Sequence, residues 1–189
     1  ASVPMTIDGQ DLAADFTLDA HASAYFVLEI APEAPDLKAG IDHAREAETF
    51  KATVNWWHAW VAQSTYSGRW QEVVTRSALT LKLLTSAKHG ATVAAVTSGL
   101  PEKPGGQDNW DYRYCWVRDA SFVMYAFLRL GLTGEAEQFR GWIGDRVRDC
   151  MDGTEPLHIM YAIDGRSGES LEEAKLDFAG WCGSRPVLI

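Results

Sequence analysis

The stretch NWDYRYCWVRD, residues 109–119, decides how the rest of the sequence is interpreted. It holds four aromatic residues, two arginines and two aspartates, and it follows a loop-forming segment with Pro104, Gly105 and Gly106. The residues after Asp119 have apolar side chains at helical spacing. We therefore expect a loop that runs into the N-terminus of a helix, with Asp119 as the N-cap.

Two interpretations of this stretch stay open at the level of the residues. Aromatic faces stack on the C–H faces of pyranose rings, and Arg donors and Asp acceptors bind sugar hydroxyls, which together indicate a carbohydrate site. The alternative is structural: Asp119 caps the helix, and the aromatic side chains fill the core beneath it.

The sequence on the C-terminal side predicts a helical hairpin. The helix that starts near Asp119 is expected to end at Gly131 and to bury Phe122, Val123, Ala126, Phe127 and Leu130. Thr133 opens the next helix, whose apolar face contains Ala136, Phe139, Trp142, Ile143, Val147 and Cys150. Residues 157–163 predict a strand that ends in the Asp164–Gly165 turn, and residues 169–178 predict a short helix or an irregular loop.

On the N-terminal side the apolar period changes several times. Residues 70–84 predict a helix, residues 91–96 a strand, and residues 101–107 a loop. Residues 36–66 predict a long helix with Asp36 as its N-cap and an apolar face of Ile41, Ala44, Ala47, Phe50, Val54, Trp57 and Val61. Alternating apolar residues at 3–7, 16–18 and 24–30 predict short antiparallel strands.

Composition excludes several classes of protein. The 189 residues include 17 basic and 26 acidic ones, and the net charge of −9 argues against a nucleic-acid or anionic-membrane partner. The longest apolar run, Phe122–Leu128, is too short to span a bilayer. The three cysteines form no C-x-x-C pair and no secretory signal is visible, which favours reduced thiols and a cytoplasmic location.

The apolar ending at residues 186–189 leads us to expect a piece of a longer protein, whose uncovered helix faces favour self-association.

Four segments carry a resemblance to a known family. They are SALTLKLLT at 77–85, LPE at 100–102, the stretch 109–120 with its W-x-R-D, and GSRPV at 183–187. In this order they resemble glycoside hydrolase family 15, above all its bacterial and archaeal glucoamylases, glucodextranases and trehalase-like enzymes. The resemblance implies a mainly α fold, in which a partial (α/α)₆ barrel at 67–189 follows the last strands of a β-sandwich at 1–35 and a linking helix at 36–66.

The resemblance also implies roles for particular residues. The substrate-binding residues it implies are Tyr112, Trp116, Arg118, Asp119, Trp181 and Arg185. The implied activity of the whole protein is that of an inverting, exo-acting, glucoamylase-like α-glucosidase, which hydrolyses α-glucans or α-glucosides from the non-reducing end. No redox cofactor is implied; some trehalase-like members are associated with phosphate or a metal, and the sequence assigns no cofactor and no metal to this chain. The alternative is a non-catalytic carbohydrate-binding or structural fragment.

The general acid and base implied by the resemblance are two glutamates C-terminal to the GSRPV segment, so we expect this chain alone to be inactive. Glu172 and Glu173 are adjacent and point in different directions, so they cannot stand on both sides of one glycosidic bond. The segments at 96–99 and at Trp181–Cys182 depart from the family pattern, which bears on substrate identity.

Three further candidates favour structural interpretations. Residues 164–168 begin like a calcium loop, but Arg166 occupies a ligand position. His58 is expected to be a packed or rim histidine. We expect Trp56, Trp57 and Trp60 to pack between the sandwich and the barrel rather than to stack on a sugar ring.

Overall fold

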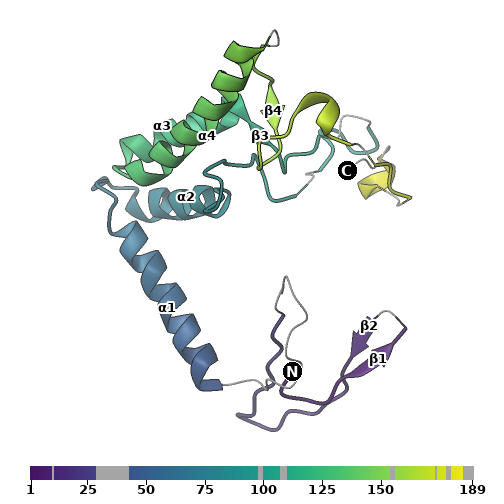
Figure 1. Cartoon of the computed structure of the whole chain (residues 1–189). Helices are drawn as coiled ribbons and strands as arrows, with labels where there is room; N and C mark the ends of the chain where they lie inside the picture. Colours follow the sequence, from purple (N-terminus) through teal and green to yellow (C-terminus); the bar gives the residue numbers. More distant parts are fainter. Residues whose placement is uncertain are drawn as a thin grey trace. The chain divides into compact units, whose positions relative to one another are not determined.

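The structure is a computed structural model, and it describes residues 1–9, 11–28, 43–97, 100–106, 110–153, 156–172, 174–177 and 180–184. The chain divides into two compact units, Ala1–His58 and Ala59–Ile189. The described residues are mainly helical, as predicted, while the barrel stays a prediction (Figure 1). Within this part of the chain, no helix combines the length and the apolar character that crossing a membrane requires.

A short hairpin begins the first unit. Strand β1 (Thr6–Asp8) pairs antiparallel with β2 (Asp11–Ala13), and Ile7 lies opposite Leu12. The structure thus confirms a strand only at the end of the predicted segment 3–7, where it covers residues 6–8, and places its partner where none was predicted.

Residues 16–18 and 24–28 are not strands, so the prediction of strands there is wrong; Ile30 lies outside the described residues. These segments meet through the Phe16 and Phe26 rings, 5.8 Å apart, rather than through a backbone ladder. Alternating side chains alone do not make a strand, because a strand needs a neighbour to accept its backbone hydrogen bonds.

One long helix, α1 (His43–Val61), crosses from the first unit into the second. The predicted start at Asp36 and the face residue Ile41 lie outside the described residues. The helix ends five residues before the predicted position, because turn bonds from Gln63 to Trp60 and from Ser64 to Val61 close its last turn. Among the α1 residues whose burial is described only Trp60 is buried, and Trp60 belongs to the second unit, not to the predicted apolar face.

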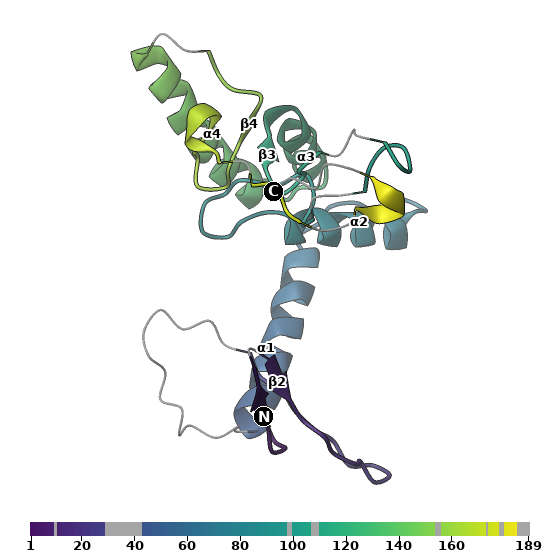
Figure 2. The same cartoon turned by 90° about the vertical axis from the view of Figure 1, so that its right-hand side faces the viewer.

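Three further helices build the second unit. Helix α2 (Gln71–Leu83) confirms the prediction for residues 70–84, and α4 (Thr133–Asp152) begins at the predicted residue. Helix α3 (Val117–Arg129) is joined to α4 by three residues, and the two helices pack against each other (Figures 1 and 2). Gly131 turns the chain between them with φ at +81°, a conformation that favours glycine.

The prediction that Asp119 caps α3 is wrong. The N-cap is Trp116, in extended conformation (φ −79°, ψ 117°), and Asp119 lies inside the first turn. The reason is the strand that precedes the helix: β3 (Cys115–Trp116) pairs antiparallel with β4 (Met160–Tyr161) and holds Trp116 extended up to the helix start.

The core of the second unit is formed where the helices meet. Phe127 is 0% exposed, and its ring meets Trp60 edge-on at 6.1 Å. Phe139 stacks on Trp142 at 5.8 Å, as their predicted place on the inner face of α4 requires, whereas Val147 of that predicted face is exposed.

Phe122 was predicted to be buried and is 71% exposed. The buried residues of α3 are Ala120, Met124 and Phe127, and Phe122 lies about 200° around the helix from Ala120.

A buried ion pair joins three helices within this core. Glu135 of α4 accepts hydrogen bonds from Lys82 of α2 at 2.7 Å and from the Trp60 indole at 2.8 Å. Burial by itself raises the pKa of Glu135, but these two hydrogen bonds outweigh it and hold the pKa below the ordinary glutamate value.

The two predicted strands near the site are shorter than expected. Residues 91–96 form only a bridge between Thr85 and Thr92, and residues 157–163 contribute only β4. The turn at Asp164–Gly165 is confirmed, with Gly165 N–H donating to Ala162 C=O at 2.8 Å. Residues 168–170 form a short 3₁₀ turn, which overlaps the start of the predicted short helix or irregular loop at 169–178.

Candidate functional site

The stretch from Trp110 to Asp119 lies between two neighbouring segments. On one side Ala95 N–H donates to Tyr112 C=O at 2.7 Å and Ala94 N–H donates to Tyr114 C=O at 3.0 Å. On the other side β3 pairs with β4, so that Trp116 lies opposite Met160. Because both edges are bonded, the stretch has a defined path up to the first turn of α3.

Three of the predicted sugar-binding residues come together at the start of α3. Arg118 donates from Nε and Nη2 to Asp119 Oδ2 at 3.1 and 2.9 Å, which leaves its Nη1 donors outside these two bonds. The guanidinium carbon lies 5.9 Å from the Trp116 ring centre. Both charged side chains reach solvent, at 71% exposed for Arg118 and 38% for Asp119. The group therefore presents donors, an acceptor and an aromatic ring at one place, as binding of sugar hydroxyls requires.

The indole nitrogen of Trp116 is the one buried side-chain polar atom without a hydrogen-bond partner in the described part of the chain. A buried N–H without an acceptor costs free energy. This donor belongs to the residue whose ring centre lies 5.9 Å from the Arg118 guanidinium carbon.

Beneath the group lies a buried thiol. Cys115 is fully buried, and its burial raises the pKa of the thiol to about 11, while the nearby Asp119 carboxylate acts in the same direction. A thiol with such a pKa is a packing residue rather than a nucleophile.

The second Arg–Asp pair of the stretch is less exposed, with side chains at 37% for Arg113 and 16% for Asp111. Arg113 donates from its backbone N–H and from Nε to Asp111 Oδ1, both at 2.9 Å. Burial by itself raises the pKa of Asp111, but the bonds and charge of Arg113 outweigh it and hold the pKa below its ordinary value. These two residues hold the loop by hydrogen bonds to each other. This arrangement matches the structural interpretation for this half of the stretch.

The other predicted site residues are placed separately. Trp181 is 53% exposed and begins a 3₁₀ turn (Trp181–Gly183), and Arg185 lies outside the described residues. Within the described chain, no hydrogen bond or ring contact joins Trp181 or Tyr112 to the Arg118–Asp119–Trp116 group. The structure therefore brings three of the six predicted residues together.

The remaining sequence candidates show no site chemistry. His58 is exposed in the last turn of α1, and Glu172 is exposed while Glu173 lies outside the described residues. Asp164 accepts from Arg166 Nε at 2.9 Å, so this carboxylate is engaged within its own turn. No group of three or more potential metal ligands occurs among the residues that the structure describes.

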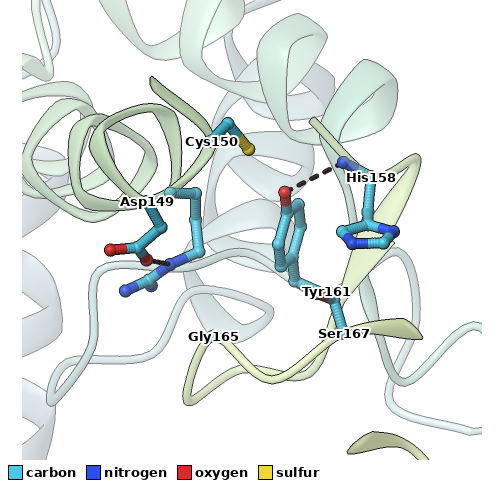
Figure 3. A pocket seen from close by; sticks show the side chains of 7 residues that line it. Asp149, Cys150, His158, Tyr161, Gly165 and Ser167 are labelled. Atoms are coloured by element: carbon cyan, nitrogen blue, oxygen red, sulfur yellow. Dashed lines mark hydrogen bonds and ion pairs between the residues drawn. The ribbon is translucent and has the colours of Figure 1, made fainter. Parts of the chain in front are cut away.

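One pocket was not predicted from the sequence. It has a volume of about 190 Å³ and lies between the end of α4 and the β4 turn, lined by Arg146, Asp149, Cys150, His158, Tyr161, Gly165 and Ser167 (Figure 3). His158 N–H donates to the Tyr161 hydroxyl at 2.9 Å, and Arg146 Nε donates to Asp149 at 3.4 Å (Figure 3).

Burial raises the pKa of Tyr161, and a hydrogen bond with Cys150 adds to the rise. The nearest sequence patterns are the predicted strand at 157–163 and the predicted apolar face of α4, and neither pattern indicates a pocket.

Comparison with known proteins gives a consistent result. Residues 68–189 match the model of the glycosyl hydrolases family 15. A trehalase of Thermoplasma acidophilum is 39% identical over 79% of this chain and 26% of its own length. A trehalase of Mycobacterium tuberculosis is 39% identical over 76% of the chain and 21% of its own length, and one of Mycolicibacterium smegmatis is 42% identical over 70% and 20%. The chain thus spans about a quarter or less of the length of these relatives, and no solved structure matches it.

Proposed function

Because this chain belongs to family 15 of the glycosyl hydrolases, we propose that the whole protein hydrolyses an α-glucoside, with trehalose as the first substrate to test. The observation that carries the proposal is the group of Arg118, Asp119 and Trp116 on the first turn of α3. The relatives named above are trehalases, so trehalose takes precedence over the α-glucans that a glucoamylase would use.

In the proposed mechanism the chain's residues bind and orient one glucose ring. Asp119 accepts hydrogen bonds from ring hydroxyls, and the unused Nη1 donors of Arg118 bind neighbouring oxygens. The Trp116 ring borders the sugar. Tyr112 lines the proposed glucose-binding pocket with these residues. Trp181 and Arg185 belong to a second loop beside that pocket.

The bond-breaking step in this proposal needs two carboxyl groups that this chain does not supply. An inverting hydrolase protonates the leaving oxygen with one carboxylic acid and activates water with a second carboxylate, roughly 6.5–9.5 Å away. By the family resemblance both glutamates lie beyond residue 189. We propose accordingly that residues 67–189 form the first part of an (α/α)₆ barrel, that residues 36–66 link it to sandwich strands at 1–35, and that this chain alone releases no glucose.

The mechanism is tested by Asp119→Ala in the whole protein. Loss of hydrogen bonds that tighten in the transition state costs on the order of 2–4 kcal/mol, so turnover of trehalose should fall about 30- to 1,000-fold. Because Asp119 is not the helix cap, the free energy of unfolding should fall only by the small contribution of a carboxylate in the first turn, about 0.3–1 kcal/mol, and the melting point should fall only slightly.

The matched control is Asp145→Ala, which removes an exposed aspartate from α4. It should leave both turnover and stability close to those of the wild type. Normal turnover in Asp119→Ala with a lowered melting point would instead support the non-catalytic, structural alternative for this stretch.

The substrate is decided by assaying glucose release from trehalose, maltose and isomaltose with the whole protein. The proposal expects trehalose to be used at the highest kcat/KM. Binding of these sugars without any release by the whole protein would favour the carbohydrate-binding alternative.

A further inference from the structure

The loop before the aromatic stretch contains a turn that leaves one backbone donor free for an outside acceptor. Gly106 N–H donates to Lys103 C=O at 2.8 Å, and Gly105 has φ at +74°. A proline at the second position and a glycine with positive φ at the third are the pattern of a type II turn. The N–H of Gly105 takes no part in the bond that closes this turn.

The acceptor for this donor is a buried serine. Gly105 N–H donates to Ser184 Oγ at 3.0 Å, and Ser184 is 1% exposed. Ser184 follows the turn that begins at Trp181, and its own N–H donates to Trp181 C=O at 3.1 Å. The hydroxyl that holds the Lys103–Gly106 turn therefore belongs to the same short turn as the exposed Trp181 ring.

The other end of the loop is attached to the aromatic stretch. The Trp110 indole donates to Glu102 Oε1 at 3.2 Å, three residues before Gly105. Residues 102–106 thus make one side-chain hydrogen bond to the stretch that leads to Arg118 and Asp119, and one to the turn that contains Trp181. We call these residues the bridging loop.

We propose that Ser184 is a positioning residue: through the bridging loop it sets where Trp181 stands relative to the Arg118–Asp119–Trp116 group. This inference rests on the proposed function, because Trp181 has to contact the sugar for its place to matter. Within the described chain Trp181 makes no hydrogen bond or ring contact with the group that holds the first glucose, and in this inference it contacts the second ring of a disaccharide. Displacement of a binding group by about 1 Å can change rates about 100-fold, so loss of the Gly105–Ser184 hydrogen bond should have a measurable effect.

The kinetic test compares two substrates in the whole protein. In Ser184→Ala we expect KM for trehalose to rise about tenfold or more, while KM for α-glucosyl fluoride, which has no second sugar, stays within about twofold. Ser184→Thr keeps the hydroxyl and should restore KM for trehalose. Ser77→Ala, an exposed serine of α2 whose hydroxyl bonds only its own helix, is the matched control.

Equal loss with both substrates in Ser184→Ala would show a merely structural role and overturn the inference. Unchanged kinetics with both substrates would overturn it as well. Absence of any hydrolysis by the wild-type protein would count against the proposed function, and the position of the loop would then be decided by a second measurement.

That measurement needs no activity. It uses two observables. Amide hydrogen exchange at Gly105 reports the Gly105–Ser184 hydrogen bond, and the indole ¹H–¹⁵N signal of Trp181, assigned with Trp181→Phe, reports the surroundings of Trp181. Ser184→Ala should lose protection at Gly105 and shift the Trp181 signal, and Ser184→Thr should retain both. Unchanged protection and an unchanged signal in Ser184→Ala would refute the positioning role.

Discussion

The two units of the chain have similar apolar patterns and very different interiors. In the described part of Ala1–His58 no residue is buried, and Ile7 and Leu28 are among its most exposed apolar side chains. In the described part of Ala59–Ile189 the buried residues come from α1, α2, α3 and α4, from the segments around β3 and β4, and from residues 85–92 and Ser184. The difference follows from packing between elements: α3 packs against α4 and β3, and Lys82 of α2 pairs with Glu135 of α4, whereas the described strands of the first unit form a two-stranded hairpin without a buried residue.

This comparison shows where the stability of the chain resides. A two-stranded hairpin without a packed face is marginal in water. Burial of large apolar side chains provides most of the stabilisation of a folded unit, and these side chains lie in the second unit. The candidate sugar-binding group stands on this stable part, at the first turn of α3.

The comparison is tested most severely at the centre of the second core. Phe127→Ala removes a fully buried ring that contacts Trp60, and we expect it to lower the free energy of unfolding of the second unit by about 3–5 kcal/mol. Phe122→Ala on the same helix is the control and should change it by less than about 0.5 kcal/mol, because Phe122 is exposed.

Denaturant unfolding followed by tryptophan fluorescence gives both values. Equal losses in the two variants would mean that Phe122 is covered in the folded protein and that the inner face of α3 has been misassigned.

The next largest effect concerns the buried ion pair. Glu135→Gln keeps an acceptor for the Trp60 indole but removes the negative charge that pairs with Lys82, so we expect a loss of about 3 kcal/mol. The pair Glu135→Leu with Lys82→Met is the control and should recover much of this loss, since it removes both buried charges.

The same pair gives a pH dependence with a definite sign. The pKa of Glu135 is lower in the folded unit than in the unfolded chain, so its contribution is complete above the ordinary glutamate pKa. That contribution is lost as pH falls through the lowered pKa of the folded state. The stability difference between wild type and Glu135→Gln should therefore shrink on acidification, and a difference that grows would contradict the assignment.

The sequence predicted local structure well where a repeating pattern and a stop signal coincide. Helix α4 begins at Thr133 as predicted, and Gly131, with its positive φ, follows the end of α3. Prediction failed where the outcome depends on a distant partner. Asp119 is not the cap because β4, about 40 residues later, holds Trp116 extended, and no pattern near Asp119 shows this pairing.

For the candidate site the same limit applies. Residue types identified Arg118, Asp119 and Trp116 as sugar-binding candidates, and these three do lie together. Composition could not separate them from Asp111 and Arg113, which have the same chemistry but satisfy each other. The bond between Gly105 and Ser184 spans 79 positions, and no local spacing indicates it.

A smaller effect is expected at the turn that joins α3 to α4. Gly131→Ala forces an L side chain into positive φ, and its Cβ would lie 2.8 Å from Thr65 Cγ2, so we expect a loss of about 1–2 kcal/mol. Gly141→Ala is the matched control: it lies within α4 with no atom near the new Cβ, and it should stabilise the unit by about 0.5–1 kcal/mol. Thermal melts that move in the same direction for both variants would contradict these placements.

The smallest effect is expected in the hairpin of the first unit. Ile7 is 80% exposed opposite Leu12, so Ile7→Thr removes little buried apolar surface and keeps a β-branched side chain suited to a strand. We expect the free energy of unfolding of the second unit to change by no more than about 0.5 kcal/mol. Denaturant unfolding followed by tryptophan fluorescence measures this, because the buried Trp60 and Trp142 both belong to the second unit. A loss above about 1 kcal/mol would mean that Ile7 is covered in the folded protein, and the contrast between an unburied first unit and a packed second unit would then fail.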